Sequence, residues 1–237
     1  MFQKAKSNLI MYLPRHPCWE CFRMLRGIII VLEGIVCAGK STAGSSLSDY
    51  LNRIGIRAKY FPEYTNDFLL SLFLKDMKTN AFAFQMFMLS KRIDVYKEAE
   101  RFAKKGYVVI MDRSLVGDKT FCSLQKDCGN ISEEQWDSYV NTARKEAVLT
   151  PSIIVYIECD SKKALGRVGT RGNSSEIKGY NVEYFENLSL AYEESLSNTT
   201  VPVLRYPTEK LSMKVGEVVQ DQDCLSLLRY IKSSILR

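Results

Sequence analysis

The chain has 237 residues, of which 46% are hydrophobic and 25% are charged, with a formal net charge of +6. This size and composition are typical of one compact domain with a sizeable core, and they exclude a disordered chain. No apolar run reaches the roughly 18 residues of a membrane span, and the 33 basic residues are dispersed along the chain. We therefore expect no membrane and no nucleic-acid partner, whereas a phosphate-bearing small ligand fits the charge.

The seven cysteines are an odd number, and no clear signal peptide opens the chain. We therefore expect a reducing, cytoplasmic setting. Residues 1–26 contain five basic residues, one acidic residue and two prolines, a composition that predicts a basic, flexible N-terminal extension. A mitochondrial location is the alternative if this extension is a targeting segment. Residues 27–237 then form the folded domain.

From residue 27 onward, short β-rich runs alternate with longer helical stretches. The strand candidates are residues 27–33, 56–61, 107–112, 152–158 and 201–206. The helix candidates are residues 40–54, 65–76, 80–105, 115–126, 132–149, 180–198 and 217–235. Near-continuous apolar strands alternating with helices predict an α/β fold, with a five-stranded parallel sheet and helices on both faces. Such sheets bind ligands at the carboxyl ends of their strands.

The stretch EGIVCAGKST follows the first strand candidate and contains the pattern G-x-x-x-x-G-K-[ST]. Its backbone N–H groups and the following helix N-terminus would face phosphates, Lys40 would neutralise their charge, and Ser41 could bind Mg²⁺. A structural glycine turn ahead of a helix is the alternative. The predicted phosphate-binding residues are Gly34, Ile35, Val36, Cys37, Ala38, Gly39, Lys40, Ser41 and Thr42.

Charged residues also follow the second and third strand candidates. Glu63 comes after the second, where its carboxylate could take the proton from an acceptor hydroxyl. After the third, Asp112 could orient a magnesium-bound water, which makes it a metal-site candidate together with Ser41. The next residue, Arg113, could bind a phosphoryl group or steer Glu63. A solvated carboxylate and a structural ion pair are the alternatives.

Two arginines four residues apart, Arg167 and Arg171, follow the fourth strand candidate and a short helix. Their spacing places them on one face of a helix, and the Gly172 and Asn173 that follow allow a hinge. This arrangement predicts a mobile flap that closes over phosphates. Ordinary solvated arginines at a helix end are the alternative.

In their order along the chain, these motifs resemble the deoxynucleoside kinase family. The resemblance rests on EGIVCAGKST, Glu63, FQMFMLSKR at 84–92, Asp112-Arg113-Ser114 with Asp118, and RVGTRGNSSE at 167–176. It covers about residues 27 to 206. The phosphate loop alone is shared by many enzymes, whereas the ordered set is much more specific. The resemblance implies a P-loop kinase fold with an Arg-containing lid, ATP and Mg²⁺ as cofactors, a deoxynucleoside substrate and a homodimer.

Residue by residue, the resemblance implies that Glu63 is the general base for the 5′-hydroxyl and that Arg113 steadies it and the transferred phosphoryl group. Arg167 and Arg171 would bind the donor phosphates. Glu176 would accept a hydrogen bond from the sugar 3′-hydroxyl. The other implied substrate residues are Phe68, Phe84, Gln85, Met88, Arg92 and Asp118.

The resemblance also assigns parts of the base site. Gln85, whose amide both donates and accepts, would read the base edge, and Phe84 would form a packing wall. Arg92 and Asp118 stand where the deoxycytidine and deoxyguanosine kinases keep an Arg/Asp pair near the base. Met88 stands where deoxycytidine kinase has a small residue, so its longer side chain should crowd a purine.

Five positions depart from the family pattern, and one of them is Asp112, which begins the Arg-containing motif where Glu is usual. Tyr64 stands where Pro usually follows the base, and Phe68 replaces a Trp. Leu74 replaces the Tyr that joins the 3′-hydroxyl contact. Cys122 replaces the aromatic residue that stacks on the nucleobase, with Phe121 one position early.

We therefore expect transfer of the γ-phosphate of ATP to the 5′-hydroxyl of a deoxynucleoside, with a pyrimidine or broad acceptor range. A thymidylate kinase is the first alternative, because it shares the loop and an Asp-Arg pair but needs a cationic site for its acceptor's phosphate. A non-catalytic nucleotide-binding protein is the second, suggested by Leu74 and Cys122.

Overall fold

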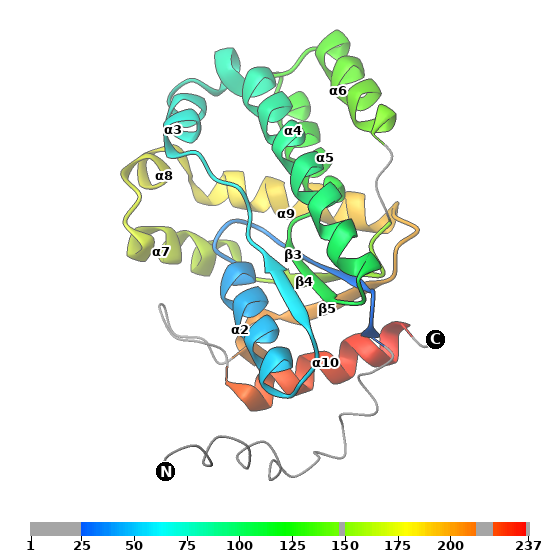
Figure 1. Ribbon diagram of the computed structural model, residues 1–237. Coiled ribbons are helices and arrows are strands. Elements are labelled where there is room, and N and C mark those ends of the chain that lie inside the picture. Colours follow the sequence, from blue (N-terminus) through cyan, green and yellow to red (C-terminus); the bar gives the residue numbers. More distant parts are fainter. Residues whose placement is uncertain (1–24, 147–149, 212–219, 236–237) are drawn as a thin grey trace, which may run out of the picture.

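The computed structural model describes residues 25–146, 150–211 and 220–235, which form one sheet with helices around it (Figure 1). The expected N-terminal extension, residues 1–26, lies outside the described residues except for its last two. Within the described ranges, no helix combines the length and the apolar character that crossing a membrane requires.

The five predicted strands form a single parallel sheet in the order β2-β3-β1-β4-β5. Their bounds are β1 (Ile29–Glu33), β2 (Ala58–Phe61), β3 (Val108–Asp112), β4 (Ile153–Glu158) and β5 (Val203–Pro207). Each begins one or two residues later than predicted. Before β1, Gly27 has a left-handed φ of 78°, a conformation that ends extended pairing. Leu32 pairs in register with Asp112, so the carboxyl ends of β1 and β3 lie level.

Helices cover both faces of the sheet, as predicted. Figure 1 shows α2 and α10 on one side and α4 and α9 on the other. Their packing confirms the α/β architecture, since α2 and α10 contact the strands on one side and α4 contacts β1, β2 and β3 on the other. The helices are α2 (Lys40–Arg53), α3 (Asp67–Lys75), α4 (Met77–Lys104), α5 (Leu115–Asp127), α6 (Glu133–Lys145), α7 (Ser161–Arg171), α8 (Ser174–Gly179), α9 (Val182–Ser197) and α10 (Asp221–Ile235).

Side-chain caps explain where several of these helices begin. Asn66 caps α3 by accepting a hydrogen bond from the Leu69 N–H, and Asp76 caps α4 by accepting one from Thr79. The helix predicted at 80–105 therefore starts three residues earlier, at Met77, directly after its cap. The helix predicted at 132–149 ends at Lys145.

The expected hinge after Arg171 is a break between two short helices. Gly172 ends α7 with a left-handed φ of 80°, and the Asn173 side chain caps α8. The sequence predicted the first of these helices without bounds and missed the second, which has only six residues. The two helices turn the chain back toward α3, which α8 contacts.

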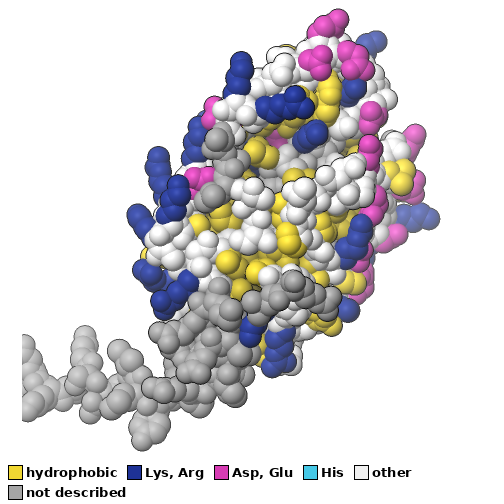
Figure 2. Space-filling view, turned by 90° about the vertical axis from the view of Figure 1, so that its right-hand side faces the viewer, with side chains coloured by type: hydrophobic (Ala, Val, Ile, Leu, Met, Phe, Trp, Pro, Cys, Tyr) yellow, Lys and Arg dark blue, Asp and Glu magenta, His cyan; other side chains and the backbone are white. Residues whose placement is uncertain are grey.

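Apolar side chains collect in two clusters. The larger surrounds the sheet and includes every residue of β1 except Glu33. The smaller lies between α3, α4, α5 and α6 and includes Phe73, Leu89, Cys122 and Tyr139. On the face shown in Figure 2, basic side chains border one edge and acidic side chains the opposite edge, with apolar side chains between them. The basic residues do not form one continuous surface on this face.

Candidate active site

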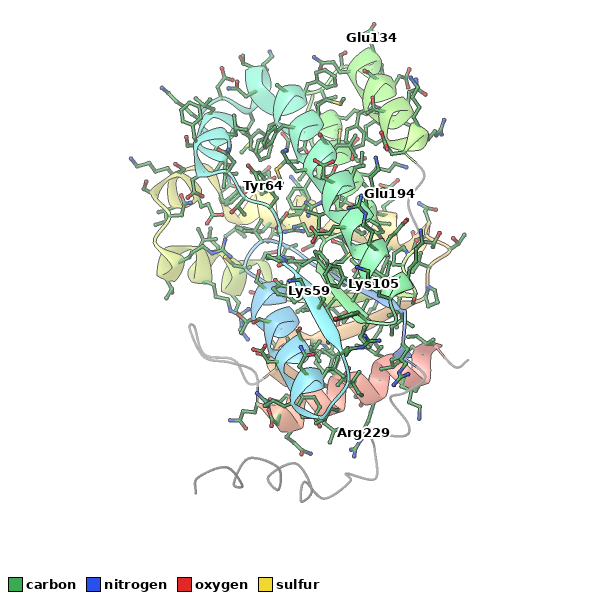
Figure 3. All side chains as sticks on the ribbon, in the orientation of Figure 1. Lys59, Tyr64, Lys105, Glu134, Glu194 and Arg229 are labelled. Carbon is green, nitrogen blue, oxygen red and sulfur yellow. The ribbon has the colours of Figure 1, made fainter. Side chains whose placement is uncertain are left out.

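A cleft of about 820 Å³, counting its open mouth, lies at the carboxyl ends of the strands. This volume is typical of a small-molecule site. Figure 3 shows Tyr64, one of its lining residues, in the connection between β2 and α3. The predicted site residues that line the cleft are Val36, Cys37, Lys40, Ser41, Glu63, Phe84, Gln85, Met88, Arg92, Arg113, Asp118, Arg171 and Glu176.

The loop between β1 and α2 has the backbone that a phosphate cradle needs. Gly34 has a φ of 144°, and a Cβ there would lie 2.6 Å from the Ile157 carbonyl oxygen. Gly39 has a φ of 104° at the N-cap of α2. Both positions therefore require glycine. The α2 N-terminus, which includes Lys40, Ser41 and Thr42, directs its free N–H groups toward the loop.

Lys40 is buried at the centre of this loop. Its Nζ donates to the Ile35 carbonyl oxygen at 2.8 Å. Burial, together with the nearby Arg113 charge, lowers the pKa of Lys40 to about 8. An anion beside the ammonium group would relieve both effects, because it would compensate the buried charge.

Arg167 contacts the same loop from α7. Its guanidinium donates to the Cys37 carbonyl oxygen at 3.1 Å and to the Thr208 hydroxyl at 3.2 Å. Thr208 in turn donates to the Ala38 carbonyl oxygen at 2.9 Å. The structure thus brings Arg167 to the phosphate loop as expected. Thr208 was missed, because it lies 170 residues from the loop residue that it contacts.

Ser41 and Asp112 meet at the end of β3. The Ser41 hydroxyl donates to Asp112 Oδ2 at 2.6 Å, and the Tyr60 hydroxyl reaches the same oxygen at 3.3 Å. The other carboxylate oxygen, Oδ1, is buried and has no hydrogen-bond partner among the described residues. A hydroxyl and an unsatisfied carboxylate oxygen are the hard oxygen donors that Mg²⁺ prefers. The pair therefore fits a magnesium site.

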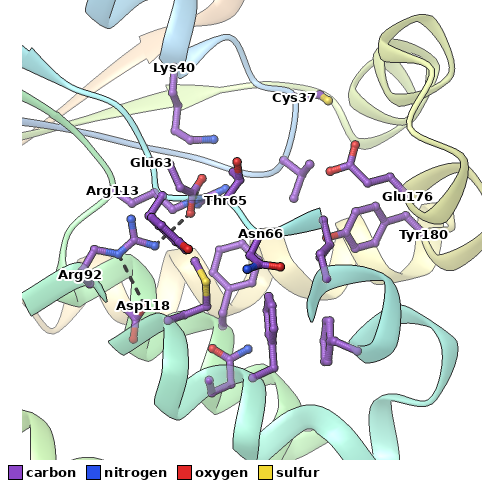
Figure 4. A pocket seen from close by; sticks show the side chains of 18 of the residues that line it. Cys37, Lys40, Glu63, Thr65, Asn66, Arg92, Arg113, Asp118, Glu176 and Tyr180 are labelled. Carbon is purple, nitrogen blue, oxygen red and sulfur yellow. Dashed lines mark hydrogen bonds and ion pairs between the residues drawn. The ribbon is translucent and has the colours of Figure 1, made fainter. Parts of the chain in front are cut away.

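Glu63 lies between two arginines, as Figure 4 shows. Arg92 donates to Glu63 Oε1 at 2.9 Å, and Arg113 Nε donates to Oε2 at 2.9 Å. Burial opposes ionisation of this carboxyl, but Arg113 and Arg92 outweigh it and lower the pKa of Glu63 to about 2. The side chain is 24% exposed, so one side of the carboxylate faces the cleft.

The predicted Arg/Asp pair is present and continues into the core. Arg92 Nε lies 3.5 Å from Asp118 Oδ1, and the Tyr139 hydroxyl donates to Asp118 Oδ2 at 2.7 Å. Burial raises the pKa of Asp118, and the Arg92 charge opposes that rise. A buried chain of contacts therefore links α6 to Glu63 through Asp118 and Arg92.

Arg113 is held in place from several sides. Its Nη1 donates to the Gly34 carbonyl oxygen at 2.9 Å and to the Tyr192 hydroxyl, and its guanidinium lies 4.6 Å from the Phe121 ring centre. Arg113 also has a left-handed φ of 69°, which is strained for a non-glycine residue. Such strain persists only where the surrounding contacts enforce it, so the position of Arg113 is tightly determined.

Glu33 anchors this arrangement and was missed as a site residue. It is fully buried and accepts from the Ser114 N–H and hydroxyl, both at 2.7 Å, and from the Gly117 N–H at 3.1 Å. Its other oxygen accepts from the Tyr192 hydroxyl at 2.9 Å. Glu33 thus fixes Ser114, which follows Arg113 in the chain, and Tyr192, which Arg113 contacts. The sequence held one signal for this residue, because Glu33 is a carboxylate at the end of an otherwise apolar strand.

Helix α4 supplies the far wall of the cleft. Gln85 is only 2% exposed, and Met88 lies one turn further along the helix. Phe84 stacks on Phe73 of α3 with ring centres 4.7 Å apart. Phe84, Gln85 and Met88 therefore share a largely apolar compartment with one buried amide.

Phe68 does not join this compartment, which corrects its predicted substrate role. Its side chain is 69% exposed and does not line the cleft. The residues of α3 and its N-cap that line it are Asn66, Leu70 and Phe73, spaced four and three residues apart. That spacing marks one helical face, and Phe68 lies on another. Counting residues along the chain gives the position of Phe68 but does not show on which face of α3 its side chain lies.

Phe121 rather than Cys122 faces the cleft. Phe121 lines it, whereas Cys122 is fully buried and packs in the smaller apolar cluster. Burial raises the pKa of Cys122 to about 12, so the thiol stays protonated. An aromatic side chain thus lines the cleft one position before the expected one.

The two short helices α7 and α8 close the remaining side. Glu176 is 5% exposed, and both of its oxygens lie near Arg171 Nη1, at 3.3 and 3.4 Å. Asn173 fixes the turn by accepting from the Glu176 N–H. Tyr180 and Tyr184 also line the cleft and were not predicted as site residues.

A phosphate loop after β1, a carboxylate after β2 that lies between two arginines, and an Asp-Arg pair at the end of β3 define a P-loop phosphotransferase. The sequence model described as "Deoxynucleoside kinase" matches residues 30–224. The chain therefore belongs to the deoxynucleoside kinase family and is a phosphotransferase that acts on a deoxynucleoside.

Several relatives are similar over most of their length. A deoxyadenosine kinase of Dictyostelium discoideum is 27% identical over 187 residues, which cover 77% of this chain and 73% of the relative. A deoxyadenosine/deoxycytidine kinase of Bacillus subtilis is 28% identical over 189 residues, covering 76% and 82%. A solved deoxyadenosine kinase from M. mycoides with dCMP and dCDP bound is 25% identical and covers 87% of this chain and 100% of that one, with a TM-score of 0.69.

Proposed function

We propose that this protein transfers the γ-phosphate of ATP to the 5′-hydroxyl of a deoxynucleoside. The observation that carries the proposal is the Glu63 carboxylate, which Arg92 and Arg113 hold at 2.9 Å on each side in the cleft that Lys40 also lines. Phosphoryl transfer needs a positioned acceptor and compensation of negative charge. This cleft combines both on neighbouring strands.

The donor side consists of the loop from Gly34 to Ser41 and the two arginines of α7. Backbone N–H groups and Lys40 would hold the β- and γ-phosphates, with Arg167 and Arg171 on their outer side. Ser41 and Asp112 would hold a magnesium ion, which neutralises charge on the phosphates when bound. Among these groups, Asp112 Oδ1 has no hydrogen-bond partner among the described residues, so it is open to a cation.

On the acceptor side, Glu63 would accept a hydrogen bond, and then the proton, from the 5′-hydroxyl. Its pKa of about 2 keeps it ionised throughout the neutral range. A carboxylate of low basicity is a weak base in the ground state, so its main contribution would be orientation, with proton transfer late in the reaction. Arg113 would bridge Glu63 and the phosphoryl group.

We propose a broad acceptor range that includes deoxyadenosine and deoxycytidine. Two observations support this range. Two of the relatives carry these nucleosides in their names. The buried Gln85 amide can pair with either base, because it both donates and accepts, and flexible Met88 can adjust to different ring sizes. A preference for pyrimidines and the homodimer stay predictions.

The two alternatives lack support from the cleft. A thymidylate kinase needs a free cation for its acceptor's phosphate. Beyond Lys40 of the loop, the described cations lining the cleft are Arg92, Arg113 and Arg171. Arg113 and Arg171 would serve the transferred and donor phosphates, and Arg92 lies between Glu63 and Asp118, so none of these cations is left for a second acceptor phosphate. A protein that only binds nucleotides does not need a proton acceptor, whereas Arg92 and Arg113 position the Glu63 carboxylate as one.

Glu63→Gln tests the proposal. The variant should keep ATP binding, measured by calorimetry, while turnover falls by about 10²- to 10⁴-fold, because the amide cannot accept the proton. Glu98→Gln is the matched control, since Glu98 is exposed on α4, and it should leave turnover unchanged. If the Glu63 variant keeps native turnover, Glu63 is not the base.

A further inference from the structure

The hydroxyl of Tyr180 lies in the cleft with no hydrogen-bond partner among the described residues. Figure 4 shows its ring pointing into the cavity on the same side as Glu176. Tyr180 is 8% exposed, and its backbone N–H donates to the Glu176 carbonyl oxygen at 3.0 Å. A tyrosine hydroxyl on a side chain with so little solvent exposure usually has a hydrogen-bond partner. The missing partner points to a ligand group.

Close packing between α8 and α3 sets the position of Tyr180. A Cβ on Gly179 would lie 2.7 Å from the Leu74 Cβ, so the two helices approach as closely as glycine permits. On its other side, the Tyr180 ring packs on Tyr184 at 5.0 Å and on Phe185 at 5.4 Å between ring centres. The ring is therefore fixed before any ligand binds.

The position of Leu74 makes this phenol informative. Leu74 occupies the place where the family resemblance puts a Tyr for the sugar 3′-hydroxyl, and an apolar side chain cannot form that bond. Leu74 instead packs against Gly179, directly beside Tyr180. The hydroxyl of the residue that follows α8 thus lies near the part of the cleft where α3 has none.

Glu176 and Tyr180 together offer what one ligand hydroxyl needs. An ionised Glu176 can only accept a hydrogen bond, whereas the Tyr180 phenol can also donate one. Both residues are less than 10% exposed, at 5% and 8%, so a ligand hydroxyl here would lose most of its water contacts. Such a group binds well only when both its donor and its acceptor functions are satisfied.

We propose that Tyr180 acts with Glu176 to bind the 3′-hydroxyl of the acceptor, replacing the phenol absent at position 74. This inference rests on the proposed function, since it requires a nucleoside whose 5′-hydroxyl lies at Glu63. Tyr180 then selects acceptors that carry a 3′-hydroxyl. Tyr184 does not share this role, because its hydroxyl, which has no hydrogen-bond partner among the described residues, is fully buried and therefore not open to the cleft.

The test compares Tyr180→Phe with the native protein on matched acceptors. Deoxyadenosine and deoxycytidine are each paired with the 2′,3′-dideoxynucleoside, which lacks only the 3′-hydroxyl. In the variant, kcat/KM should fall about tenfold for the deoxynucleosides, as expected for one lost hydrogen bond. It should change less than about twofold for the dideoxynucleosides, because they cannot form that bond. Tyr230→Phe, an exposed tyrosine on α10, is the control.

Three results would overturn the inference. An equal loss on both kinds of acceptor would show that the oxygen serves the structure of the cleft. No loss on either would show that it binds nothing. If the native protein phosphorylates no nucleoside, the proposed function fails as well, and this result is distinct because it appears before any variant is compared. Melting temperatures of the native and variant proteins verify that both are folded.

Discussion

The donor and acceptor sides of the cleft are built in different ways. The donor side is mostly local in sequence, since one loop and the first turn of α2 provide its N–H groups, Lys40 and Ser41. The acceptor side gathers side chains from the connections after β2 and β3, from α3, α4, α5 and α8, and from the segment that follows α8. A local motif depends mainly on backbone conformation, whereas an assembled site depends on the packing that joins its parts. The acceptor side should therefore be the more sensitive to substitutions in the core.

The largest expected effect comes from Arg92→Gln, which removes a central contact of the acceptor side. Arg92 is 6% exposed and contacts Glu63 and Asp118. Its loss leaves the buried Asp118 without a charged partner, so the free energy of unfolding should fall by about 3 kcal/mol. Arg101→Gln, at an exposed position of the same helix, should cost less than about 0.5 kcal/mol. Denaturant titrations measure both, and equal losses would contradict the account.

On the donor side we expect a smaller effect, a dependence of ATP affinity on pH. The pKa of Lys40 is lowered to about 8 in the ligand-free protein. Its ammonium is therefore charged at pH 7 and loses its proton as the pH rises above about 8. ATP affinity should then weaken by up to about tenfold per pH unit, because the phosphates need the charged form. Calorimetry from pH 7 to 10 measures this dependence.

Lys40→Met provides the control for the pH experiment. Its ATP affinity should be weak and nearly constant over the same range, because the titrating group is absent. A native protein with equally constant affinity would show that Lys40 does not titrate in this range.

The smallest expected effect concerns the corrected residue, Phe68. Phe68→Ala should change KM for the nucleoside less than about twofold, since the side chain is 69% exposed and outside the cleft. Phe84→Ala should raise KM by about tenfold or more, because it removes a wall stacked on Phe73. Steady-state kinetics of the two variants compare them directly. A larger effect at Phe68 would reverse the correction.

The sequence predicted the local features of this molecule better than the features that distant segments assemble. All five strands were predicted to within two residues of their starts, because apolar runs and flanking polar residues mark them locally. The loop glycines were predictable because their backbone conformations exclude other residues. Helix α8 was missed, since six mostly polar residues have too little periodicity to reveal a helix.

The remaining site residues required three-dimensional information. Glu33 and Tyr192 lie 159 residues apart and meet only when α9 packs on the sheet. Tyr180 acquires a role only through the approach of Gly179 to Leu74, which no local pattern encodes. Phe68 was placed wrongly because counting positions cannot fix the phase of a helix. Packing between distant segments, rather than local preference, determined these outcomes.

The most direct test of the account is the product formed from ATP, Mg²⁺ and each of thymidine, deoxycytidine, deoxyadenosine, deoxyguanosine and thymidine monophosphate. Mass spectrometry and phosphorus NMR identify the product and the phosphorylated position. The account predicts 5′-monophosphates from deoxynucleosides, deoxyadenosine and deoxycytidine among them, and no diphosphate from thymidine monophosphate. Phosphorylation of thymidine monophosphate alone, or of none of the five, would contradict it.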